Sequence, residues 1–275
     1  MLIVTKPIAP AKWRAEFLSH ISKMPSPELV FSTIHCHSVD SQKSTVPRAR
    51  FCIYRGMWGE LSIHRQNPAE LNESVYQSEL LTITTDVRMV KIHDIFDRGL
   101  ENERVDMSGG GGKVEALFWI KETATQWRFL GEAFVVGNDI DDESSNGAKL
   151  VKKKLGERMR VVNADGEEKW SWSRELTAHF GNLSPSMRGT FKNPPPGVPI
   201  STTFDNSRLK LGQIVDDLHD EVARKNFRVI IIKPEKVEKL DLNCPLETRR
   251  RWLYTYTRNK NNTEPDFWTE EECWP

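Results

Sequence analysis

Short apolar and β-branched segments recur along most of the chain. Each is about five to ten residues long and is bounded by Pro, Gly, Asn or Asp, a pattern typical of β-strands. A hairpin turn at residues 121–125 is expected to join the fourth and fifth of them. The predicted strands are residues 29–35, 50–55, 80–85, 114–120, 126–136, 227–233 and 252–256.

Helical periodicity is much rarer in this chain. Trp13, Phe17, Leu18 and Ile21 recur at helical spacing and predict a helix over residues 13–22. Two further helices are expected at residues 67–78 and 212–224, without regular alternation with the strands. Many strands with few helices favour a mainly β (α+β) barrel or sandwich over a doubly wound parallel sheet.

One domain over residues 1–275 is the simplest organisation for this pattern. Two polar stretches interrupt it and are interpreted as insertions, at about residues 97–113 and 138–147. The first ends in a serine and four glycines at 108–112, a composition typical of flexible linkers. The second is acidic and rich in Ser and Asn, which predicts an exposed loop.

Composition narrows the function classes. The 39 basic and 39 acidic residues balance to a formal charge of +0, which argues against a general nucleic-acid binder. The longest apolar run, Ala116 to Ile120, is far too short to cross a bilayer. Four scattered cysteines without a C-x-x-C pair predict a reduced, cytoplasmic protein without a zinc site. His35 and His37 share one face of a strand but lack a third ligand, so no metal site is predicted.

Basic residues at strand ends carry the candidate chemistry. Arg50 and Arg55 bracket a strand of roughly 16 Å, similar to the reach of an extended mononucleotide. The next strand ends in hydroxyl and basic side chains, a donor set that suits a phosphate monoester: Thr84, Thr85, Arg88 and Lys91. Gln126 opens a later strand, and its carboxamide can both donate and accept at the edge of a flavin ring. The alternative is that these are ordinary surface charges at strand ends.

Taken in order, these segments resemble the FMN-binding split-barrel family typified by pyridoxamine 5'-phosphate oxidase, and more closely its oxidase-like branch. A strand of the form P-x-x-R-x-x-x-x-[KR]-G is matched at residues 47–56, and a Thr-Asp turn with a basic cluster at residues 84–91. The strand R-Q-[VF]-R-x-x-G is matched by Gln126, Trp127, Arg128 and Gly131. Residues 183–191, the Pro-Pro-Pro-Gly at 194–197 and the C-terminal segments from residue 226 to the end also follow the branch.

The resemblance implies a six-stranded split barrel with flanking helices, assembled as a homodimer with FMN at the subunit interface. By the same resemblance, Arg50, Thr84, Thr85, Arg88 and Lys91 would hold the phosphate and ribityl chain. Arg55 and Gln126 would stand near the ring, and Arg188 and Arg251 would close the site. Strict alternation puts Arg50 and Arg55 on opposite faces, so both reach one ligand only where the strand bulges or the ligand wraps its tip.

The chain departs from the true oxidases at their substrate site. Their Arg-x-His-x-Arg segment is replaced by residues 247–251, with Glu247 and Arg249 at the first and third positions. Their Arg-Pro-x-x-Ser-Gln segment is absent, so FMN binding is predicted without pyridoxamine-phosphate oxidation. The expected function is a flavin-dependent oxidoreductase of unknown substrate. A non-catalytic flavin-binding protein and a cofactor-less dimeric scaffold are the alternatives, and the sequence identifies no catalytic residue.

Overall fold

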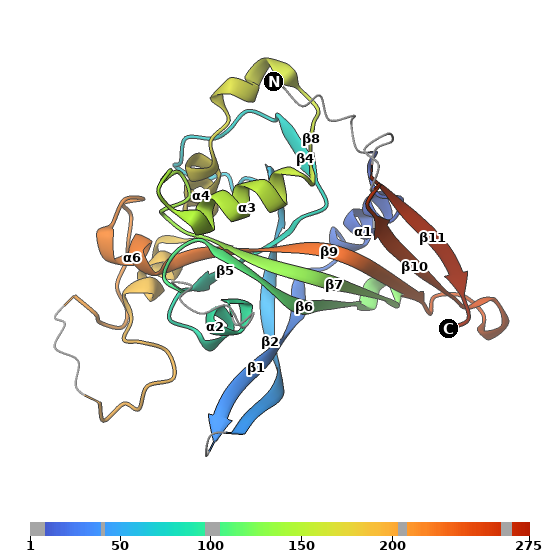
Figure 1. Cartoon of the computed structure of the whole chain (residues 1–275), viewed down its shortest axis with the longest axis horizontal. Helices are drawn as coiled ribbons and strands as arrows, with labels where there is room; N and C mark the ends of the chain where they lie inside the picture. Colours follow the sequence, from blue (N-terminus) through green and yellow to red (C-terminus); the bar gives the residue numbers. More distant parts are fainter. Residues whose placement is uncertain (1–8, 40–41, 97–104, 203–207, 260–265) are drawn as a thin grey trace.

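A large antiparallel sheet forms the centre of the molecule (Figure 1). The structure is a computed structural model that describes residues 9–39, 42–96, 105–202, 208–259 and 266–275. Its strands are β1 (Glu28–Val39), β2 (Gln42–Met57), β3 (Glu60–Leu61), β4 (Tyr76–Ser78), β5 (Leu81–Asp86), β6 (Gly109–Ile120), β7 (Thr125–Val136), β8 (Met159–Val161), β9 (Phe227–Asp241), β10 (Arg250–Thr257) and β11 (Phe267–Cys273). The α-helices are α1 (Arg14–Ile21), α2 (Val90–Phe96), α3 (Asn146–Gly156), α4 (Trp172–Gly181), α5 (Pro185–Gly189) and α6 (Glu221–Asn226).

Six of these strands are hydrogen-bonded in a ring. The sheet order is β11-β10-β9-β5-β2-β1-β6-β7, and β7 pairs again with β9. Two joints of the ring are short: β1 pairs with β6 only over Val30–Thr33, and β2 with β5 only around Tyr54 and Met57. The mainly β fold predicted from the sequence is confirmed, with the uneven pairing of a split barrel.

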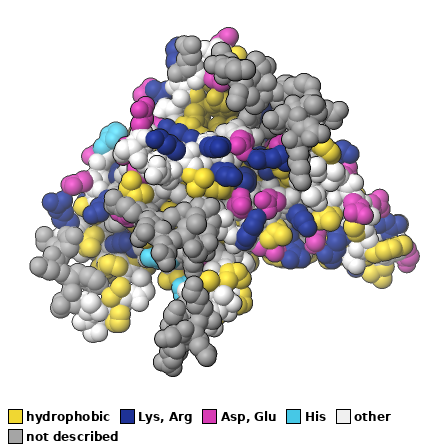
Figure 2. Space-filling view, viewed as in Figure 1, with side chains coloured by type: hydrophobic (Ala, Val, Ile, Leu, Met, Phe, Trp, Pro, Cys, Tyr) yellow, Lys and Arg dark blue, Asp and Glu magenta, His cyan; other side chains and the backbone are white. Residues whose placement is uncertain are grey.

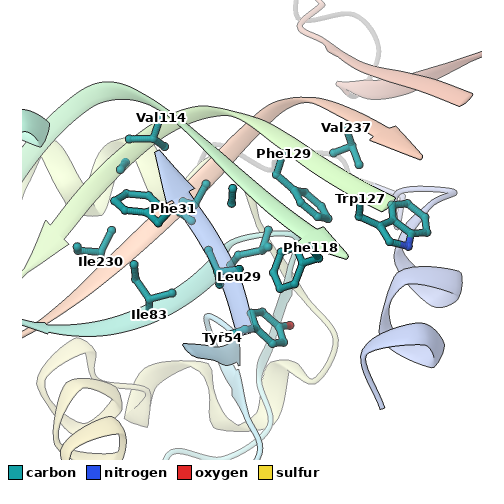
Figure 3. Packing of buried hydrophobic residues seen from close by; sticks show 14 of the residues in the cluster. Leu29, Phe31, Tyr54, Ile83, Val114, Phe118, Trp127, Phe129, Ile230 and Val237 are labelled. Atoms are coloured by element: carbon teal, nitrogen blue, oxygen red, sulfur yellow. The ribbon is translucent and has the colours of Figure 1, made fainter. Parts of the chain in front are cut away.

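The larger hydrophobic core lies inside this ring of strands. Side chains from facing strands meet there, among them Phe31, Ile83, Phe118 and Phe129 (Figure 3). Phe17 of α1 inserts its ring between them, 4.7 Å from Phe129 and 5.2 Å from Phe118, centroid to centroid. Full burial of each such ring contributes roughly 1.5–3 kcal/mol to folding. Helix α1 is therefore an integral part of the inner core.

A second core lies on the outer side of β7 and β9, beneath α3 and α4 (Figure 1). The apolar run in β9 alternates between the two cores, because successive side chains of a strand point to opposite faces. Ile230 and Ile232 join the inner core, while Val229 and Ile231 join the outer one. A strand buried on both faces must be apolar at every position, which explains this uninterrupted run. No helix in the described ranges is both long and apolar enough to cross a membrane.

Of the three predicted helices, one is wrong and one is correct only at its C-terminal end. Residues 67–75 form irregular structure, because the Asn67 and Asn72 side chains donate to backbone carbonyls of Ala178 and Ser171 around α4. The segment 212–224 becomes helical only in α6, where Asp220 caps the first turn through the amide of Ala223. Helix 13–22 is confirmed as α1, and each predicted strand contains or overlaps an observed one.

The glycine run is not a flexible linker. It forms the first residues of β6, buried against α2, and residues 97–104 of the same predicted insertion lie outside the described part of the chain. A Cβ at Gly110 would lie 2.7 Å from Ile95 Cγ2, and one at Gly112 would lie 2.8 Å from the Ile95 carbonyl oxygen. Glycine is therefore required for the close approach of helix and strand. In the second stretch only residues 141–144 form the exposed loop that was predicted, since Ile140 and Ser145 are buried.

Candidate functional site

Arg50 lies in a polar network at the mouth of the barrel, where α2 packs beside β1 and β2. Its Nη1 donates to Thr33 Oγ1 at 2.8 Å and to the Phe31 carbonyl at 3.2 Å, and its Nη2 lies 3.4 Å from Asp94 Oδ2. Asp94 also accepts from Thr33 Oγ1 at 2.5 Å and lies 2.7 Å from His35 Nδ1. The Asp94 side chain is completely buried, so these partners replace its hydration.

Lys91 begins the same helix and points into the same region. It is 8% exposed, and its Nζ donates to Thr85 Oγ1 at 3.0 Å and contacts Met89 Sδ at 2.7 Å. Within the described part of the chain, no carboxylate lies within 4.0 Å of this ammonium. Burial lowers the pKa of Lys91 and the Arg50 cation lowers it further, while the more distant carboxylates of Asp86 and Asp94 raise it. Lys91 therefore lies beside Thr85 and near Arg50, with carboxylates only beyond 4.0 Å among the described residues.

Arg88 is held by an internal partner. Its Nε and Nη2 donate to the two oxygens of Asp86 at 2.9 and 2.6 Å, a bidentate pair. Its Nη1 donates to the Asn193 carbonyl oxygen at 2.8 Å, which ties the turn after β5 to the segment following α5. Arg88 therefore borders the Lys91 region but has its charge balanced by Asp86.

Arg55 and Thr84 face the other side of the sheet. Arg55 Nε lies 3.3 Å from Thr84 Oγ1, and burial lowers the pKa of Arg55. The β2–β5 register shifts between Tyr54 and Met57, next to Gly56, whose φ is +118°. The alternation expected from the sequence is visible in these partners, since Arg50 contacts the barrel mouth and Arg55 the outer face. The bulge lies at the end of β2, beside Arg55.

Gln126 of β7 and Arg251 of β10 lie on either side of β9. Both are paired in register with Leu240 of β9, one from β7 and the other from β10, so their side chains share the outer face. Arg251 Nη1 donates to Glu238 Oε1 at 2.7 Å. No hydrogen bond or ion pair among the described residues joins either side chain to Arg50, Thr85 or Lys91.

Arg188 is separated from both groups. It is 3% exposed in α5, where Nε donates to the Val215 carbonyl at 2.8 Å and Nη1 lies 3.4 Å from the Gly181 carbonyl oxygen. Its guanidinium also lies 5.9 Å from the centroid of the Phe180 ring. These contacts tie α4, α5 and the 215 segment together, and its role in closing a ligand site stays a prediction.

Sequence reasoning missed Asp94, the residue that organises the mouth of the barrel. Its position three residues after Lys91 places both on one side of a helix turn, but α2 itself was not predicted. His35 was noted only as a possible metal ligand, and the side chain of His37 lies outside what the structure describes. Among the described residues, no group of three or more His, Cys, Asp or Glu side chains is arranged to hold a metal ion.

The donor chemistry at the barrel mouth fits the phosphate of FMN. A buried ammonium with no described carboxylate within 4.0 Å, a hydroxyl and a guanidinium are the groups that bind a phosphate dianion through charge-assisted hydrogen bonds. Lys91 and Thr85 would hold it most directly. Arg50 would contribute from beside them, although Asp94 already takes part of its charge.

Comparison with known proteins finds a matching family model and a yeast relative. Residues 10–137 match the family model described as pyridoxamine 5'-phosphate oxidase, FMN-binding domain. An uncharacterized protein of Saccharomyces cerevisiae, YGR017W, is 22% identical over 250 residues, which cover 72% of this chain and 82% of the yeast protein.

Solved structures resemble the chain over nearly its whole length. The crystal structure of a pyridoxamine 5'-phosphate oxidase-related, FMN-binding protein from Nostoc punctiforme aligns with a TM-score of 0.59 at 19% identity, covering 98% of this chain and 100% of that one. PhzG from Burkholderia lata, in complex with tetrahydrophenazine-1-carboxylic acid, aligns with a TM-score of 0.46 at 12% identity, covering 100% and 98%. Residues 10–137, a little under half of the chain, thus match the FMN-binding domain model of pyridoxamine 5'-phosphate oxidase, and the fold of the chain is similar to that of the Nostoc protein.

Proposed function

We propose that the protein is an FMN-binding flavoprotein that works as a flavin-dependent oxidoreductase. The observation that carries the proposal is Lys91, a buried ammonium with Thr85 Oγ1 3.0 Å away and no carboxylate beside it in the described structure. A buried cation without an anionic partner is costly, and a bound phosphate would supply the missing charge. FMN, when bound, would supply the electron transfer, and this chain's residues would position it.

We further propose a homodimer that completes the site. The outer faces of β1, β2 and β6 carry an apolar row in which exposed Phe51 is in register with half-buried Val30 and Leu117. Phe51 is 78% exposed and Trp119, in register with Gln126, is 48% exposed. Large aromatic side chains left in water favour burial against a partner, and closed two-fold dimers are the commonest assembly. A second copy on this face would bring its own residues against Arg55, Thr84, Gln126 and Arg251.

The cofactor is tested by titrating the apo-protein with FMN and following flavin fluorescence. Replacing Lys91 by Gln should weaken binding by about one to two orders of magnitude, because a hydrogen bond to a charged group contributes roughly 1.5–3 kcal/mol. Lys121→Gln, an exposed change in the β6–β7 hairpin, is the matched control and should bind as the unaltered protein does. Equal affinity of both variants would contradict the phosphate role of Lys91.

Turnover distinguishes the oxidoreductase from the two alternatives. Anaerobic mixing with NADH or NADPH should bleach the flavin if the protein accepts electrons from a nicotinamide donor, and oxygen should restore the colour. A flavin that stays oxidised with every donor tested would favour a carrier without turnover. A colourless protein whose unfolding temperature is unchanged by added FMN would favour the cofactor-less scaffold. The substrate and the cytoplasmic location stay predictions.

A further inference from the structure

A basic pocket lies outside the flavin region, where α3 meets the outer side of β7, β9 and β10. Its volume is about 430 Å³, within the usual range for small-molecule sites. Figure 2 shows Lys and Arg side chains interspersed with carboxylates across the middle of this face, over β7 and β9. Five cations and two carboxylates line the pocket: Lys154, Arg158, Lys233, Lys236, Arg258, Glu132 and Glu235.

The two carboxylates of the pocket are already paired. Glu132 lies 2.7 Å from Lys233 Nζ and 3.6 Å from Lys113 Nζ, and Glu235 lies 2.7 Å from the same Lys113. Together these ion pairs lower the pKa of Glu132 against the opposing effect of its burial. Glu132 is thus held by two lysines, while Glu235 pairs with Lys113 and also raises the pKa of Arg158 from a distance.

Three cations of the pocket have no such partner. Within the described residues, no carboxylate lies within 4.0 Å of Lys154, Arg158 or Lys236. Arg158 is 6% exposed, and its guanidinium carbon lies 3.3 Å from the centroid of the Tyr256 ring. One of its nitrogens donates to the Pro234 carbonyl at 2.8 Å, and burial lowers its pKa. Tyr256 and Pro234 thus fix a guanidinium at the pocket whose other donors are not taken by a described acceptor.

We propose that this pocket binds a small phosphate ester or pyrophosphate. Three cations in one cavity, each without a described carboxylate within 4.0 Å, match a multiply charged anion, and a fixed guanidinium with two lysines is a donor set suited to phosphate oxygens. Leu130, 43% exposed, provides an apolar wall for the organic part of an ester. None of the residues that line the pocket is used in the flavin proposal, so the proposed phosphate binding is independent of flavin binding.

The experiment is calorimetric titration with inorganic pyrophosphate, in the unaltered protein and in Lys91→Gln. The Lys91→Gln variant lacks the ammonium proposed to bind phosphate at the barrel mouth, so pyrophosphate binding at that site does not contribute to its titration. Saturable binding is expected in both, and Lys154→Gln and Lys236→Gln should each weaken it about tenfold through loss of one charge-assisted contact. Lys153→Gln, an exposed change in the same helix outside the pocket, is the matched control and should leave affinity unchanged.

Several results would overturn the proposal. One is the absence of saturable binding at millimolar pyrophosphate in the Lys91→Gln background. Another is equal weakening by Lys153→Gln, which would indicate a general effect of surface charge. Citrate serves as a tricarboxylate comparison, and tighter binding of citrate than of pyrophosphate would contradict the phosphate assignment. The unfolding temperature of each variant is measured alongside, and it should be unchanged because Lys154 and Lys236 lie outside both cores.

Discussion

Asp94 of α2 faces Arg50 of β2 across the mouth of the barrel, with 3.4 Å between Oδ2 and Nη2. The same carboxylate accepts a hydrogen bond from the Thr33 hydroxyl and lies within hydrogen-bond distance of His35 Nδ1. One buried side chain therefore joins α2 to β1 and β2. It also holds a negative charge close to the proposed phosphate position. Stability and anion affinity should therefore respond in opposite directions when this charge is removed.

The Asp94→Asn variant tests the stability side of this relationship. Loss of the charged acceptor should lower the free energy of unfolding by roughly 1–3 kcal/mol, because hydrogen bonds to a charged group are replaced by weaker ones. Urea denaturation provides the measurement. The control is Asp165→Asn, an exposed position that should change stability by less than about 0.5 kcal/mol. Similar losses in both variants would contradict a structural role for Asp94.

Substitutions of Arg50 and Asp94 should have different effects on FMN affinity. Arg50→Ala should weaken FMN binding by about one to two orders of magnitude, through loss of a charge-assisted contact. Asp94→Asn should bind FMN at least as tightly as the unaltered protein, because a negative charge beside the phosphate is removed. Both are measured by fluorescence titration of apo-protein. Unchanged affinity in Arg50→Ala would remove Arg50 from the cofactor site.

His179 should make stability depend on pH. Complete burial lowers its pKa from 6.5 to about 3, and neither ring nitrogen has a hydrogen-bond partner within the described structure. The unfolded chain binds a proton below pH 6.5 that the folded chain does not, so stability should fall as pH drops from 6.5 toward 3. At pH 5 this effect should lower the free energy of unfolding by roughly 2 kcal/mol relative to pH 7.

Urea denaturation at pH 7 and pH 5 measures this effect. His179→Phe keeps a ring for the stacked contact with Trp58, 5.5 Å between centroids, and should lose most of this pH dependence. His219→Gln, which alters an exposed histidine, should keep it. An equal pH dependence in His179→Phe and the unaltered protein would assign the effect to other groups.

Phe51 should control the oligomeric state. A charge in the centre of the apolar row would be desolvated in a dimer, so Phe51→Glu should shift the protein toward monomer. Sedimentation equilibrium or light scattering measures the mass. Leu211→Glu, at a comparably exposed position outside the row, should leave the assembly unchanged. A monomeric unaltered protein would contradict the proposed dimer directly.

Gly131 should tolerate no side chain. An added Cβ would lie 2.1 Å from the Lys233 carbonyl oxygen, at the bulge where the β7–β9 register shifts. Gly131→Ala should therefore cost roughly 1–3 kcal/mol of stability, the usual range for overpacking. Gly156→Ala, at the end of α3 with no atom within 4 Å of its Cβ position, should be neutral or stabilising by up to about 1 kcal/mol. Thermal unfolding of the two variants gives the comparison.

The sequence by itself determined the strand content and the first helix, and the order of its motifs indicated the resemblance to FMN-binding split barrels. Alternation and β-branched runs are local signals, and β9 could be recognised from Val229 to Ile232 because burial on both faces demands apolar side chains throughout. Thr85 and Lys91, proposed to bind phosphate, could also be named from the sequence, since they lie only six residues apart in the chain.

Tertiary structure decided the rest. Polar side chains overrode helix periodicity where Asn67 and Asn72 bind the backbone around α4, a contact over about a hundred residues of sequence that no local window contains. The sequence suggested that Gly110 belongs to a linker, because the residue that makes glycine necessary there, Ile95, belongs to another element. The pairing of Arg50 with Asp94 likewise depends on α2 folding onto the barrel. Contacts between distant segments depend on the chain's path in space, and residue type alone does not encode that path.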